Sequence, residues 1–472
     1  MREKKKGANS MARYILTFKT PGGNYVYDRE VNSLLSVSEM EFAAFRHIEN
    51  GSDVDDDWEL LKRYTEQGYL QETRLQEVVH PEMPYLEFHL SSRVTQITLQ
   101  VCQVCNLRCK YCAYAGNYEH QRIHSNKNMS LDVMKKSVDF VMNRSHDVEE
   151  ITIGFYGGEP LLEIENIKLC IAYIREAYSS RAVRYTVTTN GTLFNDDILN
   201  FLRLNKFSVN ISFDGPQELH DLNRVFSDGS GSYEKIMSNV RYIKEKYPDV
   251  FENVSFLTVV APGVDLACIN EFFNASDVLS NNMVNQNLVN AFSSKKDIVY
   301  DDLYVITRNY QYMKVLLSAL GWYKNKTSIL FKRSITDVEV FYKSLSQIKM
   351  GEKSHPSGPC LPGAMRPIVT VDGDIYPCER VNENASVMKI GNVDTGFDLD
   401  RVKAILNVGK ITEEECKVCW NFFHCNLCAA ACDGGESLSR DMRLKNCDLS
   451  KRNAIETFRT ICLLEENGYK FV

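Results

Sequence analysis

The sequence predicts an α/β protein built around a partial (β/α)6, TIM-like barrel, with a winged-helix-like module before it and a cysteine-rich domain after it. Three observations support this prediction. Six apolar segments alternate with helical segments between residues 91 and 298, a rhythm typical of parallel β/α units. The first 90 residues show a different pattern of short strands and helices. Eight cysteines lie between Cys360 and Cys447.

Composition limits the class of protein. A chain of 472 residues predicts two or three domains, and 44% apolar with 25% charged residues is typical of a soluble globular protein. The basic N-terminus lacks the apolar segment of a signal peptide, and no apolar run is long enough to span a bilayer. We therefore expect a cytoplasmic protein with no membrane partner. The net charge of −7 argues against nucleic acid as a partner.

The N-terminal module, residues 1–90, is predicted from its strands, helices and turns. Its expected elements are strands at 13–18 and 24–28, a helix that begins at Ser38 and ends before Gly51, a helix at 58–67 and a strand at 69–72. Ser38 and Glu41 form a capping-box pattern, which fixes the start of the first helix. A DNA-binding role is disfavoured, because the second helix has only Lys62 and Arg63 as positive charges.

The barrel is predicted for residues 91–298. Its strands are expected within the segments 94–101, 149–160, 183–191, 207–216, 253–262 and 282–292. Glycine and polar motifs follow these strands at their C-terminal ends, where barrels of this type place their chemistry. Residues 299–355 predict a helical bridging region, and residues 356–472 predict short strands and loops that contain the eight cysteines.

Three cysteines follow the first barrel strand in the segment "CNLRCKYC": Cys105, Cys109 and Cys112. In a reducing compartment, the chain's fifteen cysteines favour metal ligation over disulfides. A disulfide uses cysteines in pairs, and structural zinc takes four ligands. Three thiolates on a [4Fe–4S] cluster instead leave one iron open. The odd number therefore predicts a metal centre with a free coordination position.

This CxxxCxxC motif, together with "GGEP" after the second strand, resembles the radical S-adenosylmethionine (SAM) superfamily. The resemblance implies that SAM chelates the open iron and is cleaved to a 5′-deoxyadenosyl radical. It also implies a set of SAM-binding residues: Gly157, Gly158, Glu159 and Pro160 near the ammonium group, Ser212 and Arg224 at the ribose and carboxylate, Tyr111 near the adenine, and Asn190 and Val260 as weaker matches.

The eight C-terminal cysteines resemble the SPASM domain, which carries two auxiliary iron–sulfur clusters. The chain departs from the family pattern at Cys428, which is inserted between Cys425 and Cys432. Eight thiols suffice for two fully ligated [4Fe–4S] clusters. The implied ligands are Cys360, Cys378, Cys428 and Cys432 for auxiliary cluster I, and Cys416, Cys419, Cys425 and Cys447 for auxiliary cluster II. If Cys428 is not a ligand, cluster I keeps an open iron.

Other cysteines and one acidic residue complete the set of candidates. Cys102, Cys170, Cys268 and Cys462 are expected to be packing residues. Glu379 follows Cys378 at a position where some SPASM relatives carry an acidic proton acceptor, which makes it a candidate catalytic residue; a surface salt bridge is the alternative. A zinc ribbon is the alternative for the C-terminal cysteines.

As a whole, the chain resembles radical SAM–SPASM maturases of ribosomally made peptides, in particular the sactipeptide and ranthipeptide types that form thioethers. The N-terminal module resembles a PqqD-like leader-peptide recognition element, in which a strand edge captures a peptide. The resemblance implies three [4Fe–4S] clusters, SAM, a Cys-rich precursor peptide and a flavodoxin- or ferredoxin-type electron donor. The radical would abstract a hydrogen, a Cys sulfur would bond to the resulting carbon, and an auxiliary cluster would take the surplus electron.

Two alternatives remain open from the sequence. Other SPASM chemistry, such as anaerobic sulfatase maturation or carbon–carbon crosslinking of peptides, would use the same cofactors. A non-catalytic, zinc-stabilised peptide-binding protein would use the cysteines for structure alone. Metal analysis separates the second alternative from the enzymes, because three cubane clusters contain iron and absorb visible light.

Overall fold

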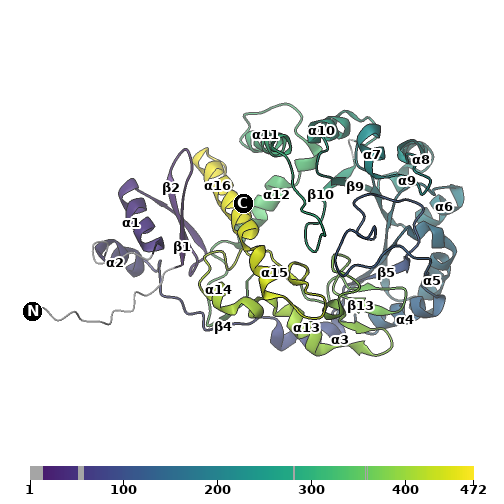
Figure 1. The fold of residues 1–472 in the computed structure, drawn as a ribbon, viewed down its shortest axis with the longest axis horizontal. Helices are drawn as coiled ribbons and strands as arrows, with labels where there is room; N and C mark the ends of the chain where they lie inside the picture. The colour runs from purple at the N-terminus through teal and green to yellow at the C-terminus, as the bar shows by residue number, and fades with distance from the viewer. Residues whose placement is uncertain (1–13, 51–57, 280–281, 357, 359, 472) are drawn as a thin grey trace, which may run out of the picture.

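The computed structural model describes residues 14–50, 58–279, 282–356, 358 and 360–471. Gly51, expected just after the first helix, lies outside this range, as do Ser357 and Pro359 of the expected domain boundary. Figure 1 shows the N-terminal module at one end, the barrel at the other and the C-terminal domain between them. No helix in the described part of the chain is long and apolar enough to cross a membrane.

A ten-stranded sheet forms the centre of the molecule. Its strands, in spatial order, are β10 (Met283–Leu288), β9 (Val254–Val260), β8 (Ser208–Ser212), β7 (Ala182–Thr189), β6 (Glu150–Gly157), β5 (Gln96–Cys102), β12 (Ile368–Val369), β13 (Asp374–Tyr376), β14 (Gly391–Asn392) and β15 (Gly396–Phe397). All pairs from β5 to β10 are parallel, which confirms the six predicted barrel strands.

The outer face of the barrel is covered by helices (Figure 1). They are α4 (Leu131–Met142), α5 (Ile164–Ala177), α6 (Asp196–Leu204), α7 (Gln217–Asn223), α8 (Tyr233–Lys246), α9 (Pro248–Phe251) and α10 (Leu266–Ala275). Side chains alternate along each strand. Ile97 and Ile153 are buried in the hydrophobic core, whereas Thr98 and Gly154 line the internal cavity. The barrel therefore has an apolar outer layer and a partly polar interior.

The C-terminal domain continues the barrel sheet. Strand β12 pairs in parallel with β5, with Ile368 opposite Thr98, and in antiparallel fashion with β13. The helices of this half of the chain are α11 (Asp302–Ala319), α12 (Ser334–Ser344), α13 (Leu399–Leu406), α14 (Glu413–Lys417), α15 (Arg440–Lys445) and α16 (Cys447–Glu466). Helices α11 and α12 lie within residues 299–355, where the sequence predicts helical structure.

The N-terminal module contains a three-stranded antiparallel sheet of β1 (Ile15–Lys19), β2 (Asn24–Asp28) and β3 (Ser33–Val37), followed by α1 (Glu39–Glu49) and α2 (Trp58–Glu66). The predicted capping box is confirmed, because Ser38 and Glu41 each accept a hydrogen bond from the other's backbone amide. The strand predicted at 69–72 is wrong. Leu70 has a φ of 51° and donates its amide to buried Asp28 (2.6 Å), which interrupts an extended conformation.

A short helix crosses the expected end of this module. Helix α3 (Leu86–Ser92) places Leu86 and Leu90 in the core of the barrel, so these residues pack with the barrel. Before it, β4 (Glu77–Val78) pairs in parallel with β11 (Lys353–Ser354). The segment between the two domains is thus tied to both the barrel and the C-terminal region.

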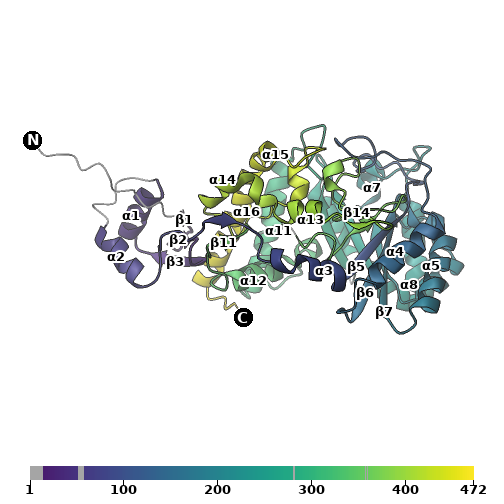
Figure 2. The same cartoon turned by 90° about the horizontal axis from the view of Figure 1, so that it is seen from below.

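The module packs against the last helix of the chain, and Figures 1 and 2 show its sheet beside α16. Phe458 of α16 is fully buried. Its ring lies 4.5 Å from that of Tyr27 and 6.1 Å from that of Phe18, measured between ring centroids. These contacts join the first and last elements of the chain.

We predict that Phe458→Ala lowers the free energy of unfolding by about 3–5 kcal/mol, because it leaves a cavity under the sheet. Urea unfolding measures the loss, and limited proteolysis should show faster cleavage within residues 14–50. Leu449→Ala, on the same helix but 44% exposed, is the control and should change stability by no more than about 0.5 kcal/mol. Equal stability of the two variants would contradict this docking contact.

Candidate active site

The three cysteines of "CNLRCKYC" follow β5 and line one cavity inside the barrel, with a volume of about 910 Å³. Burial is the main reason why the pKa of Cys105 is raised to about 12, and the neighbouring thiols Cys109 and Cys112 raise it further. Burial likewise raises the pKa of Cys109 to about 11 and that of Cys112 above its usual value. Three buried thiols on one cavity form a donor set of the type that a metal cluster uses.

Two glycines at the end of β6 allow the backbone to approach this cysteine loop. The Gly158 amide donates to the Cys102 carbonyl (2.8 Å). A Cβ atom on Gly157 would lie 2.2 Å from the Cys102 carbonyl oxygen, and one on Gly158 would lie 1.9 Å from that of Val104. Only glycine fits such an approach. Both glycines line the cavity, so their backbone is available to a bound molecule.

A buried carboxylate holds together the part of the cavity wall that contains Tyr111 and Arg224. Asp214, at the end of β8, accepts hydrogen bonds from Arg224 Nε (2.9 Å), the Tyr111 hydroxyl and the Val259 amide (3.0 Å). The Arg224 guanidinium also lies 4.0 Å from Cys109 Sγ. Sequence reasoning selected Tyr111 and Arg224 but missed Asp214, although the acid in "ISFDGP" was a visible signal.

The expected SAM-binding residues divide into two groups. Tyr111, Gly157, Gly158, Asn190, Ser212 and Arg224 all line the cavity. Glu159, Pro160 and Val260 are buried and do not line it. The Glu159 carboxylate instead accepts hydrogen bonds from the Asn190 amide (2.6 Å), the Thr189 hydroxyl (2.7 Å) and the Leu161 amide (3.1 Å). Contrary to expectation, its side chain joins β6 to the loop after β7.

The pKa of Glu159 agrees with this structural role. Burial raises the pKa to about 7, although the three hydrogen bonds oppose the rise. Its carboxylate oxygens are therefore already used by the protein. The backbone of Gly157 and Gly158 is the part of "GGEP" that remains available at the cavity.

The eight C-terminal cysteines form two groups by their mutual electrostatic effects. Burial is the main cause of the raised pKa of Cys360, Cys378 and Cys432, and the neighbouring Cys428 raises each further. In the same way, burial and then Cys425 raise the pKa values of the other three: Cys416, Cys419 and Cys447. Cys425 also raises the pKa of Cys432, so the two groups adjoin at these two residues. Apart from that contact, the groups have the same members as the two ligand sets expected from the sequence.

A second cavity, of about 380 Å³, is lined by Cys416, Cys419, Cys425 and Cys447. Its four thiols are the usual ligand type of an iron–sulfur cluster. They line the cavity without converging, since no group of three or more His, Cys, Asp or Glu side chains among the described residues is arranged to hold a single metal ion. Of the cysteines expected to be packing residues, Cys102, Cys170 and Cys462 are buried, but Cys268 is exposed, and the prediction for it is wrong.

Glu379 lies on the wall of the barrel cavity and forms an ion pair with Arg366. The salt bridge expected as the alternative is therefore present. Both residues come from the C-terminal domain, so this domain contributes one side of the cavity. Its acidic group faces the same space as the three cysteines.

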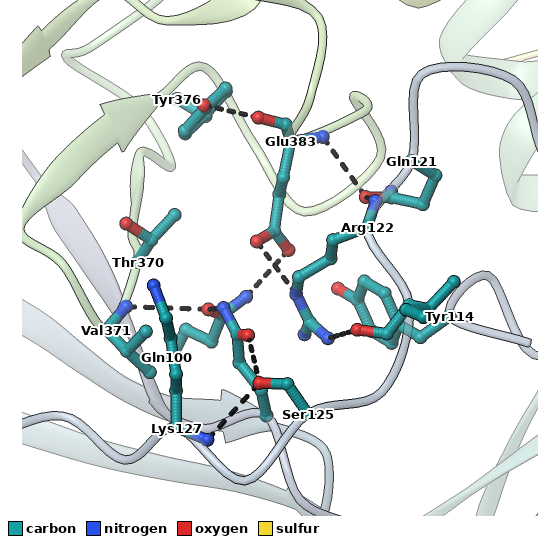
Figure 3. Close-up of polar contacts among 12 residues, drawn as sticks. Gln100, Tyr114, Gln121, Arg122, Ser125, Lys127, Thr370, Val371, Tyr376 and Glu383 are labelled. Atoms are coloured by element: carbon teal, nitrogen blue, oxygen red, sulfur yellow. Dashed lines mark hydrogen bonds and ion pairs between the residues drawn. The ribbon is translucent and has the colours of Figure 1, made fainter. Parts of the chain in front are cut away.

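A buried ion pair ties the cysteine loop to the C-terminal domain (Figure 3). Arg122 Nε lies 2.9 Å from Glu383 Oε2, and both side chains are 8% exposed. Gln100 of β5 donates to the same carboxylate (2.6 Å), and the Arg122 guanidinium lies 3.5 Å from the centre of the Tyr114 ring. Sequence reasoning missed this pair, because its partners are 261 residues apart.

We predict that Asp214→Asn lowers the free energy of unfolding by about 3–5 kcal/mol, because it leaves the buried Arg224 without its carboxylate partner. Urea unfolding under anaerobic conditions measures the effect. Glu218→Gln, an exposed position on α7, is the matched control. A loss no larger than that of the control would show that Asp214 does not hold this wall together.

We also predict strong coupling between Arg122 and Glu383. Arg122→Met and Glu383→Gln should each cost about 3–5 kcal/mol, whereas the double variant should cost clearly less than their sum. Lys127 and Asp372 join the same two segments at 2.9 Å but are about 60% exposed. The double-mutant cycle of Lys127 and Asp372 should give a coupling energy of at most about 1 kcal/mol. Additive losses for Arg122 and Glu383 would refute the coupling.

The part of the chain that contains the cysteine loop and the glycine motif is similar to known proteins. The sequence model of the radical SAM superfamily matches residues 99–275. The cysteine-type anaerobic sulfatase-maturating enzyme of Clostridium novyi is 28% identical over 355 residues, covering 73% of this chain and 82% of that enzyme. The radical SAM cyclopropyl synthase TigE of Paramaledivibacter caminithermalis is 24% identical over 244 residues, covering 48% of this chain and 50% of that enzyme.

A solved structure, native anSMEcpe with bound AdoMet, shares the fold. It has a TM-score of 0.57 and 21% identity, and the match covers 79% of this chain and 99% of that chain. Sequence and fold thus agree over the part of the chain that contains the three cysteines and the glycine motif. This chain therefore contains a radical SAM domain within a mixed α/β fold that has a central parallel sheet and a cysteine-rich C-terminus.

Proposed function

We propose that this protein modifies a ribosomally made, cysteine-rich peptide by forming bonds between Cys sulfur and carbon. The observation that carries the proposal is the barrel cavity, which extends from the three cysteines to Glu379 of the C-terminal domain. At about 910 Å³, it lies at the upper end of the range for small-molecule sites. Such a volume leaves room for substrate side chains beside a bound cofactor.

The residues at one end of the cavity fit a [4Fe–4S] cluster and SAM. Cys105, Cys109 and Cys112 would hold the cluster, and the backbone of Gly157 and Gly158 would approach the SAM ammonium group. Arg224, oriented by Asp214, offers a fork of donors to a carboxylate. When bound, SAM and its cluster supply a 5′-deoxyadenosyl radical that abstracts a hydrogen atom from carbon.

The other end of the cavity fits the peptide. Its wall includes Arg333 and Asp337 near the start of α12, and Arg366 and Glu379 from the C-terminal domain. Forming a carbon–sulfur bond from a C–H and an S–H group removes two hydrogens from the peptide. We assign to Glu379 the acceptance of the thiol proton, because its carboxylate faces the same cavity as the radical source.

The C-terminal cysteines would hold two further [4Fe–4S] clusters. Their grouping around Cys428 and Cys425 supports this assignment, and the electrostatic effect of Cys428 on Cys360, Cys378 and Cys432 supports its role as a ligand of cluster I. A flavodoxin- or ferredoxin-type protein is the proposed electron donor. With the three cysteines of the barrel, the protein would bind three clusters.

We assign capture of the leader peptide to the N-terminal module. Strand β3 lies at the edge of its sheet, and Ser36 is exposed. Among the described residues, no backbone hydrogen bond joins β3 to a segment other than β2 and its own flanking turns. Such an edge can accept a peptide as an added strand.

Anaerobic sulfatase maturation is the second candidate function. It is favoured by the similarity to a sulfatase-maturating enzyme over 73% of this chain. It would not require a leader-binding module. The two candidates therefore differ in whether the substrate needs a leader segment.

The test offers the reconstituted enzyme, SAM and reductant two substrates: a Cys-rich precursor with its leader, and a leaderless Cys-containing sulfatase peptide. We expect each thioether in the precursor to appear in mass spectra as the loss of two hydrogens, with that Cys no longer alkylatable. Glu379→Gln should lower turnover by 10²–10⁴-fold, the usual contribution of a general base.

Controls separate the alternatives. Modification of the sulfatase peptide alone, or a precursor product whose cysteines still react with alkylating agents, would overturn the thioether proposal. Zinc in place of about twelve irons would identify a structural protein without this chemistry. Lys353→Gln, which removes an exposed ion pair with Glu77, is the matched surface control for Glu379→Gln.

A further inference from the structure

A buried arginine lies between the two cysteine groups of the C-terminal domain. Arg443 of α15 is 1% exposed. Its Nη1 lies 3.7 Å from Cys432 Sγ, and its Nη2 lies 3.9 Å from Cys425 Sγ. Cys432 belongs to the proposed ligands of auxiliary cluster I and Cys425 to those of cluster II. One guanidinium therefore contacts both groups.

Two further donors of Arg443 are held by neutral groups. Nη1 donates to the Leu427 carbonyl (2.9 Å), and Nε donates to the Thr412 hydroxyl (3.0 Å). That hydroxyl lies 3.3 Å from Cys416 Sγ, which extends the network to a second cysteine of the cluster II group. These contacts fix the planar guanidinium in one orientation.

Within the described ranges, Arg443 takes part in no ion pair with Asp or Glu. After burial, the groups that act most strongly on its charge are the thiols of Cys432, Cys425 and Cys416. A buried charge without a partner is costly, so a charged group at this depth is normally paired. The partners that the structure provides are the sulfur atoms of the two cysteine groups.

We infer that Arg443 is an electrostatic link between the two auxiliary clusters, whose single positive charge stabilises the reduced form of both. Reduction adds one negative charge to a cluster, and a fixed cation close to a ligand sulfur favours that change. Hydrogen bonds to the sulfurs act in the same direction. Arg443 would thus raise both reduction potentials together. The inference rests on the proposed function only in that both cysteine groups hold clusters.

The test measures reduction potentials in the full-length protein without peptide substrate. Cys105, Cys109 and Cys112 are replaced by Ala, so that the auxiliary clusters give the only iron signals. In this background, Arg443→Gln should lower both potentials in a redox titration followed by electron paramagnetic resonance. We expect an about tenfold fall in the ratio of reduced to oxidised cluster at a fixed potential, which is 59 mV for a one-electron couple.

Two further variants make the test decisive. Arg443→Lys keeps the charge and should shift both ratios less than Arg443→Gln. Arg440→Gln, on the same helix but paired at the surface with Glu415, should leave both ratios within about twofold of the parent. Iron analysis accompanies each titration, because a variant that lacks a cluster has no potential to measure.

The outcomes are distinct. A joint fall in Arg443→Gln supports the inference, as does loss of iron from both sites in Arg443→Gln with full loading in Arg443→Lys. A shift of one cluster only, no shift, or loss of iron in both variants would overturn it. Because no peptide is present, failure here is distinguishable from failure of the thioether chemistry.

Discussion

The pairing of β12 with β5 is the constraint on which the rest of the structure depends. The strand that ends at the three-cysteine loop is also the strand on which the C-terminal sheet is built. The distance between the cysteine loop and Glu379 is therefore set by a hydrogen-bonded sheet and not by a linker. The buried pair of Arg122 and Glu383 adds a second tie between the same two parts, so the cavity they enclose is held from both sides.

Much of this arrangement follows from local sequence. The six barrel strands and the capping box at Ser38 were predicted correctly, because they depend on neighbouring residues. The cysteine loop and the two glycines after β6 lie on one cavity because the ends of parallel strands meet at one edge of the barrel. What the sequence could not supply were contacts across long separations, such as that of Asp214 with the Val259 amide.

Glu159 shows why a motif does not determine the direction of each side chain. The sequence indicates an acid at the end of β6, but the Asn190 amide and the Thr189 hydroxyl, from the next loop, decide where its carboxylate lies. The same limit applies to the strand β12, which has two residues and becomes recognisable only through its partners β5 and β13. Short elements of this kind are specified by packing and not by propensity.

Arg224 and Arg443 are buried guanidinium groups that each contact a cysteine sulfur, and their other partners differ. Arg224 lies 4.0 Å from Cys109 Sγ, but the Asp214 carboxylate at 2.9 Å offsets its charge. Arg443 contacts Cys425 and Cys432 and, in the part of the chain that the structure describes, forms no ion pair with a carboxylate. If the C-terminal groups hold the proposed clusters, the charge of Arg443 would stabilise an added electron there, as the proposed oxidative modification of the peptide requires.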